Sequence, residues 1–127
     1  MIVDTSALFV VVLGEPEAEL YLEYMMDAEE PVISAATLLE AKIIAYRKNV
    51  EKDLTQLLSV LRLTVVPLDE ELSSIAFEAY KTYGPSHPAK LNFGDCFSYA
   101  TARFREKPLL FKGADFTQTD IPSAAKR

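Results

Sequence analysis

The chain has 127 residues, of which 50% are hydrophobic and 25% are charged, with a formal net charge of −6. This length is close to the usual size of one globular domain, so we expect a single domain over residues 1–127. The acidic balance argues against binding nucleic acid by bulk electrostatic attraction. The single cysteine, Cys96, excludes an internal disulfide and favours a reducing, cytoplasmic compartment.

Charge is distributed unevenly along the chain. Residues 1–30 hold eight acidic side chains and no Lys or Arg, whereas residues 103–127 hold six basic side chains and three acidic ones. A polyanion can still meet the protein locally, especially where metal ions mask the acids. The longest apolar run, residues 7–13, is too short to cross a bilayer and follows no basic leader. We therefore expect no membrane segment and no signal peptide.

The first half of the chain predicts two short strands with helices between and after them. Pro16 is acceptable in the first turn of a helix, and Ser34 is well placed to cap one. The spacing of apolar residues then predicts a buried strand at 1–4, a brief helix at 5–14, a helix at 15–30, a strand at 32–34 and a helix at 35–49.

The second half continues the alternation of helices and strands. We expect helices at 50–63, 69–83 and 93–106, strands at 63–68 and 108–113, and a loop at 84–92. Strands separated by helices are typical of an α/β fold with a central, mainly parallel sheet. In such sheets the carboxyl ends of the strands lie along one edge, and ligands bind there.

Two acidic residues follow predicted strands and are expected at that edge. Asp4 interrupts an apolar run; the alternative is that it, or a neighbouring hydroxyl, only caps the next helix. Asp115 follows the last strand, where an ordinary turn is the alternative explanation. Asp120, just before Ile121 and Pro122, is a similar candidate, which we rank below Asp115.

Two further acids lie on predicted helices. Glu40 is flanked one turn away by Ala36 and Ile44, and a carboxylate on such a face is rarely buried without a partner. Arg47 is the structural alternative as that partner. Asp95 lies in the first turn of the helix at 93–106, where an acid also complements the helix dipole and caps free N–H groups.

Two strand ends and two helices can bring these acids together. Clustered carboxylates repel one another unless a cation keeps them ionised. A set of oxygen ligands without His or Cys suits Mg²⁺ or Mn²⁺, which support hydrolysis of phosphodiesters. The sequence therefore predicts a metal site whose carboxylates are oriented by hydroxyl groups; the carboxylates are Asp4, Glu40, Asp95 and Asp115, and the hydroxyls are those of Thr5 and Ser6.

Four segments resemble the PIN-domain family, and most of all the VapC-type toxin ribonucleases of toxin–antitoxin pairs. They are "MIVDTSAL", "ISAATLLEA", "LNFGDCFSYATA" and "LLFKGADFTQTDI", and they follow the family order over essentially the whole chain. The resemblance implies a three-layer α/β/α fold around a parallel sheet of four or five strands. It also implies an endoribonuclease that depends on Mg²⁺ or Mn²⁺.

The resemblance assigns roles to particular residues. It implies that the acidic quartet is Asp4, Glu40, Asp95 and Asp115, with Asp4 and Asp95 as the most direct metal ligands. Ser6 matches the hydroxyl that follows the first Asp of the family.

The resemblance also implies partners. These are structured RNA such as tRNA or ribosomal RNA cut in a single-stranded loop, a second copy of the chain in a homodimer, and a small VapB-type antitoxin whose C-terminal segment covers the active-site groove. Residues 21–26 give their helix more apolar surface than one buried stripe needs, which suits an adaptable partner groove; core packing is the alternative. The basic residues from Arg103 to Lys112 are expected to flank Asp95 and Asp115, where they would meet RNA phosphates or form a solvated face.

Three other functions share some of these features. A phosphatase of the haloacid-dehalogenase type needs a second acid two residues after the first, and that position is Ser6. A receiver-like phosphoacceptor domain needs paired acids at the first strand, where Asp4 has no acidic neighbour. A PIN-fold binding module without catalysis is the remaining alternative, although an idle cluster of like charges would be destabilising.

Overall fold

The computed structural model describes residues 1–125, so Lys126 and Arg127 of the basic C-terminal segment lie outside the described residues. Four parallel strands form one sheet in the order β3-β2-β1-β4. A single parallel bridge between Leu109 and Ser123 extends the sheet at its β4 edge. The strands are β1 (Ile2–Val3), β2 (Val32–Ser34), β3 (Thr64–Val66) and β4 (Leu109–Leu110). The predicted α/β fold with a parallel sheet is confirmed.

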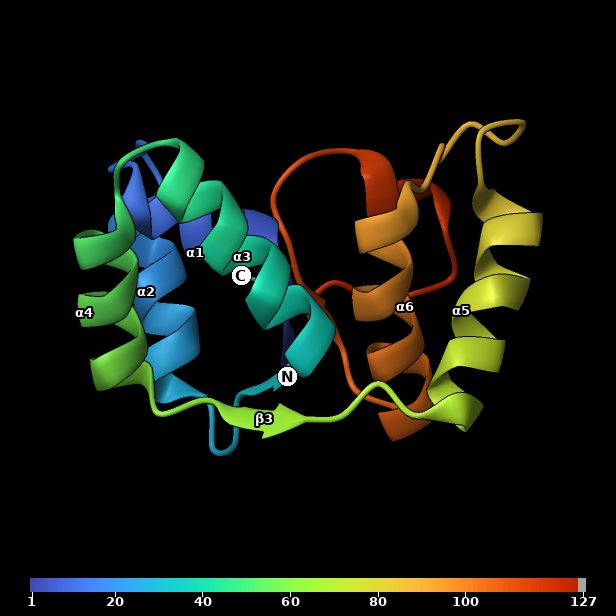
Figure 1. Ribbon diagram of the computed structural model, residues 1–127, viewed down its shortest axis with the longest axis horizontal. Coiled ribbons are helices and arrows are strands. Elements are labelled where there is room, and N and C mark those ends of the chain that lie inside the picture. The colour runs from blue at the N-terminus through green and yellow to red at the C-terminus, as the bar shows by residue number, and fades with distance from the viewer. Residues whose placement is uncertain (126–127) are drawn as a thin grey trace.

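Helices cover both faces of the sheet. Figure 1 shows α1 to α4 gathered on one side of the molecule and α5 and α6 on the other. Their bounds are α1 (Thr5–Val12), α2 (Ala18–Asp27), α3 (Ala35–Arg47), α4 (Glu51–Leu61), α5 (Glu70–Tyr83) and α6 (Phe93–Arg105), with a short 3-10 helix η1 (Asp115–Gln118). Within residues 1–125, no helix is long and apolar enough to cross a membrane.

Two separate cores follow from the alternation of side chains along the strands. Val3, Ile33 and Leu110 pack with the helices α1 to α4 on one face. The alternate strand residues, among them Ile2 and Leu109, point to the other face and pack with α5 and α6. Strands β1, β2 and β4 are fully buried and apolar except for Ser34 at the end of β2, whereas the edge strand β3 is largely exposed.

Helix α2 differs from its prediction in two ways. It begins at Ala18 instead of near Pro16, because the preceding residues form a turn and the Glu17 side chain pairs with Lys112. The apolar side chains between Tyr21 and Met25 belong mostly to the core under α1 to α4. Met26 is exposed at 52%, so core packing, the alternative to a partner groove, accounts for the other apolar side chains of residues 21–26.

Only part of the basic segment flanks the predicted site. Helix α6 runs opposite to the strands, so its first turn lies at the carboxyl edge of the sheet and its last turn at the amino edge. Arg105 and Lys107 line a surface depression together with Met1 and Glu30, at the start of the first strand. Lys112 follows β4 at the carboxyl edge, and it forms an ion pair with a glutamate of the α1–α2 turn.

Candidate active site

Asp4 lies directly after β1 and is 5% exposed. Its N–H donates to Leu110 O at 3.0 Å, which fixes it at the end of the sheet. Asp4 Oδ2 accepts from Ser6 N at 3.1 Å and Ser6 Oγ at 2.6 Å, and Oδ1 accepts from Ser98 Oγ at 2.5 Å. Asp4 therefore caps α1, and both of its oxygens are held by donors on two different helices. Hydrogen bonds to a charged group contribute roughly 1.5–3 kcal/mol each, which offsets part of the cost of burying it.

Glu40 projects from α3 toward the same edge and is partly buried. Its Oε1 accepts from Thr5 Oγ1 at 2.8 Å. Among residues 1–125, no Lys or Arg forms an ion pair with Glu40, so Arg47 is not the partner. Burial raises the pKa of Glu40, the Thr5 hydrogen bond opposes that rise, and the negative charge of Asp4 adds to it.

Asp95 belongs to a capping box at the start of α6. Asn92 Oδ1 accepts from Asp95 N at 2.9 Å, and Asp95 Oδ2 accepts from Asn92 N at 3.0 Å. Burial raises the pKa of Asp95 to about 7; the Asn92 hydrogen bond opposes the rise, and the charges of Asp4, Asp115 and Glu40 increase it. Contacts between the elements place Asp4, Glu40 and Asp95 at one edge of the fold, because Ser98 of α6 donates to Asp4 and Thr5, the residue after Asp4, donates to Glu40.

Gly94 allows α6 to approach Glu40 closely. A Cβ built at Gly94 would overlap Glu40 Oε2 and would lie 2.7 Å from Glu40 Cδ. Any side chain at this position would have to displace the carboxylate. The residue before Asp95 therefore helps to set the distance between α3 and α6 at the site.

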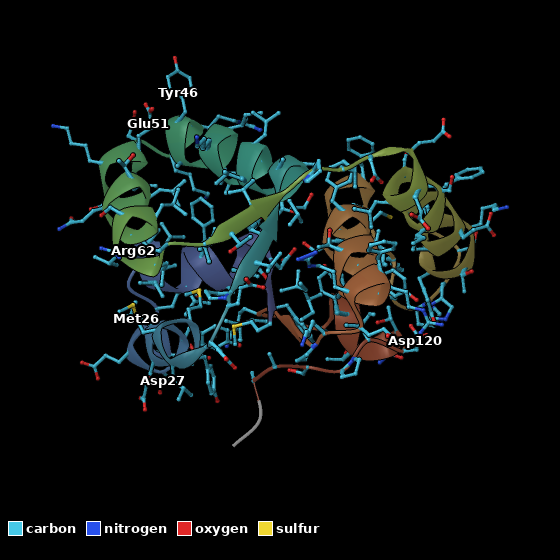
Figure 2. All side chains as sticks on the ribbon, turned by 90° about the horizontal axis from the view of Figure 1, so that it is seen from below. Met26, Asp27, Tyr46, Glu51, Arg62 and Asp120 are labelled. Carbon is cyan, nitrogen blue, oxygen red and sulfur yellow. The ribbon has the colours of Figure 1, made fainter. Side chains whose placement is uncertain are left out.

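Asp115 and Asp120 have different positions. Asp115 begins η1 just after β4, is exposed, and contributes its charge to the environment of Asp95. Asp120 lies beside α6 (Figure 2), where it accepts from Tyr99 Oη at 2.6 Å and Arg103 Nη1 at 3.1 Å. Asp115 thus follows β4 and acts on Asp95 through its charge, whereas Asp120 belongs to a separate polar cluster.

The sequence analysis missed two buried hydroxyl groups at the site. Ser98 lies one turn after Asp95, and its hydroxyl donates to Asp4. Thr37 lies one turn before Glu40, with its Oγ1 at 3.3 Å from Ser98 Oγ. The one available signal was their spacing of three residues from a candidate acid, on the same face of a helix.

The donor set is compatible with a magnesium-type ion. Residues 1–125 contain no group of three or more His, Cys, Asp or Glu side chains already arranged to hold a metal. Mg²⁺ keeps several waters and commonly uses one or two protein carboxylates plus substrate phosphates, so it needs no closed cage. Asp95 Oδ2 is engaged by Asn92, which leaves Oδ1 for a ligand. Burial raises the pKa of Cys96 to about 11, which argues against a thiolate ligand.

We expect the metal-free protein to become less stable as the pH rises from about 4 to about 7. In this range the unfolded chain has lost the Asp95 proton, whereas the folded protein still holds it, because the pKa is about 7 in the fold. The folded state then binds more protons, so its stability decreases with increasing pH. Asp95→Asn should remove this loss and raise stability at pH 8 by roughly 1–3 kcal/mol.

Urea unfolding in a chelating buffer at pH 5 and pH 8 measures this difference. The wild type should lose more stability between the two pH values than Asp95→Asn does. Parallel pH dependences in the two proteins would contradict the electrostatic description of the site.

Comparisons with known proteins identify the family. A family model of the PIN domain matches residues 1–122. VapC ribonuclease Mb0625 of Mycobacterium bovis and ribonuclease VapC28 of Mycobacterium tuberculosis are each 38% identical over 132 aligned positions, covering 100% of this chain and 99% of theirs. Ribonuclease VapC of Mycolicibacterium smegmatis is 38% identical and covers 95% of this chain and 97% of its own. The chain therefore belongs to the PIN-domain family, and the relatives to which it is similar are VapC ribonucleases.

Two solved structures share the fold. A toxin–antitoxin complex from Klebsiella pneumoniae aligns with a TM-score of 0.72 and 22% identity, over 94% of this chain and 92% of that one. VapC20 of Mycobacterium tuberculosis, described as a sarcin–ricin loop cleaving toxin, aligns with a TM-score of 0.75 and 15% identity, over 94% and 95% of the two chains. At these identities the similarity concerns the fold, and it agrees with the three-layer arrangement described above.

Proposed function

We propose that this protein is a metal-dependent endoribonuclease and the toxin of a type II toxin–antitoxin pair. The observation that carries the proposal is the set of contacts that bring the Asp4, Glu40 and Asp95 segments together: Ser98 of α6 donates to Asp4, and the Glu40 carboxylate accepts from Thr5 and lies against Gly94. Full-length similarity to VapC ribonucleases at 38% identity supports the same activity. A PIN-fold module that only binds RNA would not need these charges to be held together.

The acidic and hydroxyl side chains have different roles in this proposal. Asp4 and Asp95 are the most direct metal ligands in this proposal, and Asp115 and Glu40 complete the acidic rim. A bound Mg²⁺ or Mn²⁺ would polarise the phosphodiester and favour attack by water. Burial raises the pKa of Glu40, which suits this side chain to accept a proton from the attacking water. Ser6 and Thr5 hold the carboxylates of Asp4 and Glu40 in fixed orientations.

The proposed partners are an RNA loop, an antitoxin and a second copy of the chain, all in the cytoplasm. The substrate is a single-stranded loop of tRNA or ribosomal RNA, and a VapB-type antitoxin blocks the acidic groove. The described surface of α3 supports contact with a second copy of the chain. Leu39, Ile43 and Tyr46 form one exposed apolar stripe on this helix. Tyr46 is 68% exposed and points away from the body of the protein (Figure 2). Light scattering tests the homodimer: a mass near twice the 14.2 kDa of one chain supports it, and a monomer at micromolar concentration contradicts it.

Incubation of the purified protein with total RNA tests the proposed activity. We expect discrete cleavage products with Mg²⁺ or Mn²⁺, none with excess chelator, and recovery when the metal is restored. RNA binding without cleavage at any metal concentration would favour the non-catalytic alternative. Cleavage that persists in chelator would contradict metal dependence.

A further inference from the structure

Ser98 connects α6 to the end of β1 inside the protein. It lies on α6, one turn after Asp95, and is 1% exposed. Its hydroxyl is 2.5 Å from Asp4 Oδ1, on a residue 94 positions away in the sequence. Ser98 therefore joins the helix that carries Asp95 to the strand end that carries Asp4.

Thr37 extends this connection to α3. Its side chain is fully buried, and its Oγ1 is 3.3 Å from Ser98 Oγ. The carbonyl oxygen of Thr37 accepts from Thr5 Oγ1 at 3.4 Å, and the same hydroxyl donates to Glu40 Oε1 at 2.8 Å. The hydroxyls of Thr5, Thr37 and Ser98 thus lie between the elements that supply the carboxylates.

The hydrogen-bond inventory fixes the direction of this network. A carboxylate only accepts, so the single hydroxyl hydrogen of Ser98 must point to Asp4. The Ser98 oxygen is then an acceptor, and Thr37 is the donor that faces it. Without Thr37, the Ser98 hydroxyl keeps its bond to Asp4 but loses the buried group that fixes its orientation.

We propose that Ser98 is a positioning residue for the Asp4 carboxylate and that Thr37 acts through Ser98. This inference rests on the proposed metal-dependent function. Ser98 holds Asp4 Oδ1 while Ser6 holds Oδ2, so the orientation of the carboxylate plane is determined from both sides. Groups that orient metal ligands affect metal affinity although they do not touch the metal.

Mn²⁺ binding to the full chain, measured by calorimetry without RNA, tests the proposal. Ser98→Ala should weaken Mn²⁺ binding about 10–100-fold, as is typical when a group that orients a metal ligand is removed. Thr37→Val keeps the volume and removes only the hydroxyl, so it should give a smaller loss, about threefold to tenfold. Thr37→Ser restores the hydroxyl and should bind Mn²⁺ within about twofold of the wild type.

Thr101→Val is the matched control. Thr101 is also fully buried on α6, but its hydroxyl donates to Phe97 O within the same helix at 2.8 Å. Its removal should leave Mn²⁺ affinity unchanged, although it alters stability much as Thr37→Val does.

In RNA cleavage, Ser98→Ala should lower kcat while the KM for RNA stays the same, because Ser98 is too buried to touch RNA.

The outcomes separate this inference from the proposed function. Wild-type protein that binds Mn²⁺ and cleaves RNA, together with Ser98→Ala of equal Mn²⁺ affinity, would overturn the positioning role alone. An equal loss in Thr101→Val and Thr37→Val would also overturn it, since the effect would then be general destabilisation. Wild-type protein that binds no Mn²⁺ would overturn the proposed function and this inference together.

Discussion

Replacement of Asp95 by Asn is expected to abolish RNA cleavage and leave the fold intact. Asn keeps an oxygen that can accept from the Asn92 N–H, so the capping box at the start of α6 survives. It removes the negative charge next to Asp4, Glu40 and Asp115. Loss of a metal ligand removes several kcal/mol of transition-state stabilisation, so cleavage should decrease at least about a hundredfold. Product formation from total RNA under saturating Mg²⁺ is the measurement.

Asp120→Asn is the matched control for this variant. Asp120, like Asp95, is an aspartate in the C-terminal half of the chain. Its carboxylate accepts from Tyr99 and Arg103 instead of lying with Asp4, Glu40 and Asp95. Its variant should cleave RNA at the wild-type rate and lose at most about 1 kcal/mol of stability, since the ion pair with Arg103 is exposed. Equal activity of Asp95→Asn and Asp120→Asn would show that the site is assigned to the wrong residues.

Gly94→Ala should reduce activity by displacing Glu40. The added methyl group would occupy the space of the Glu40 carboxylate. That carboxylate is the end of a flexible side chain, so Glu40 can swing away and the fold can persist. We expect an approximately 10–100-fold loss of RNA cleavage, typical of a disturbed orientation of groups around a metal. Circular dichroism and thermal unfolding should show a folded protein.

A double-mutant cycle identifies the route of this effect. If Gly94→Ala acts through Glu40, adding it to Glu40→Ala should cause no further loss of cleavage. Equal losses from Gly94→Ala in both backgrounds would mean that the methyl group disturbs α6 itself. Wild-type cleavage by Gly94→Ala would show that the close approach of Gly94 and Glu40 has no functional role.

Local patterns predicted most of the fold. Apolar runs interrupted by Asp4 and Ser34 indicated strands that end at one edge, because strands buried on both faces tolerate polar residues only at their ends. The position of Pro16 predicted too early a start for α2, since the ion pair between Glu17 and Lys112 favours a turn there. Such contacts between distant segments leave no local pattern in the sequence.

The same distinction applies to the site. The four acids were visible as charges next to apolar residues, whereas Ser98 resembled an ordinary polar residue of a helix. Its role depends on Asp4, 94 positions away, and only the packing of α6 against the end of β1 reveals it. The sequence also could not place Arg105 and Lys107, because the direction of α6 relative to the sheet decides which edge they reach.

A crystal structure with Mn²⁺ tests the central claim most directly, since anomalous scattering locates this ion without ambiguity. The account predicts a peak at the carboxyl edge of the sheet, with Asp4 and Asp95 oxygens at about 2.0–2.2 Å, close to the distances that Mg²⁺ adopts. Manganese bound elsewhere on the surface, with both of these side chains uncoordinated, would contradict it.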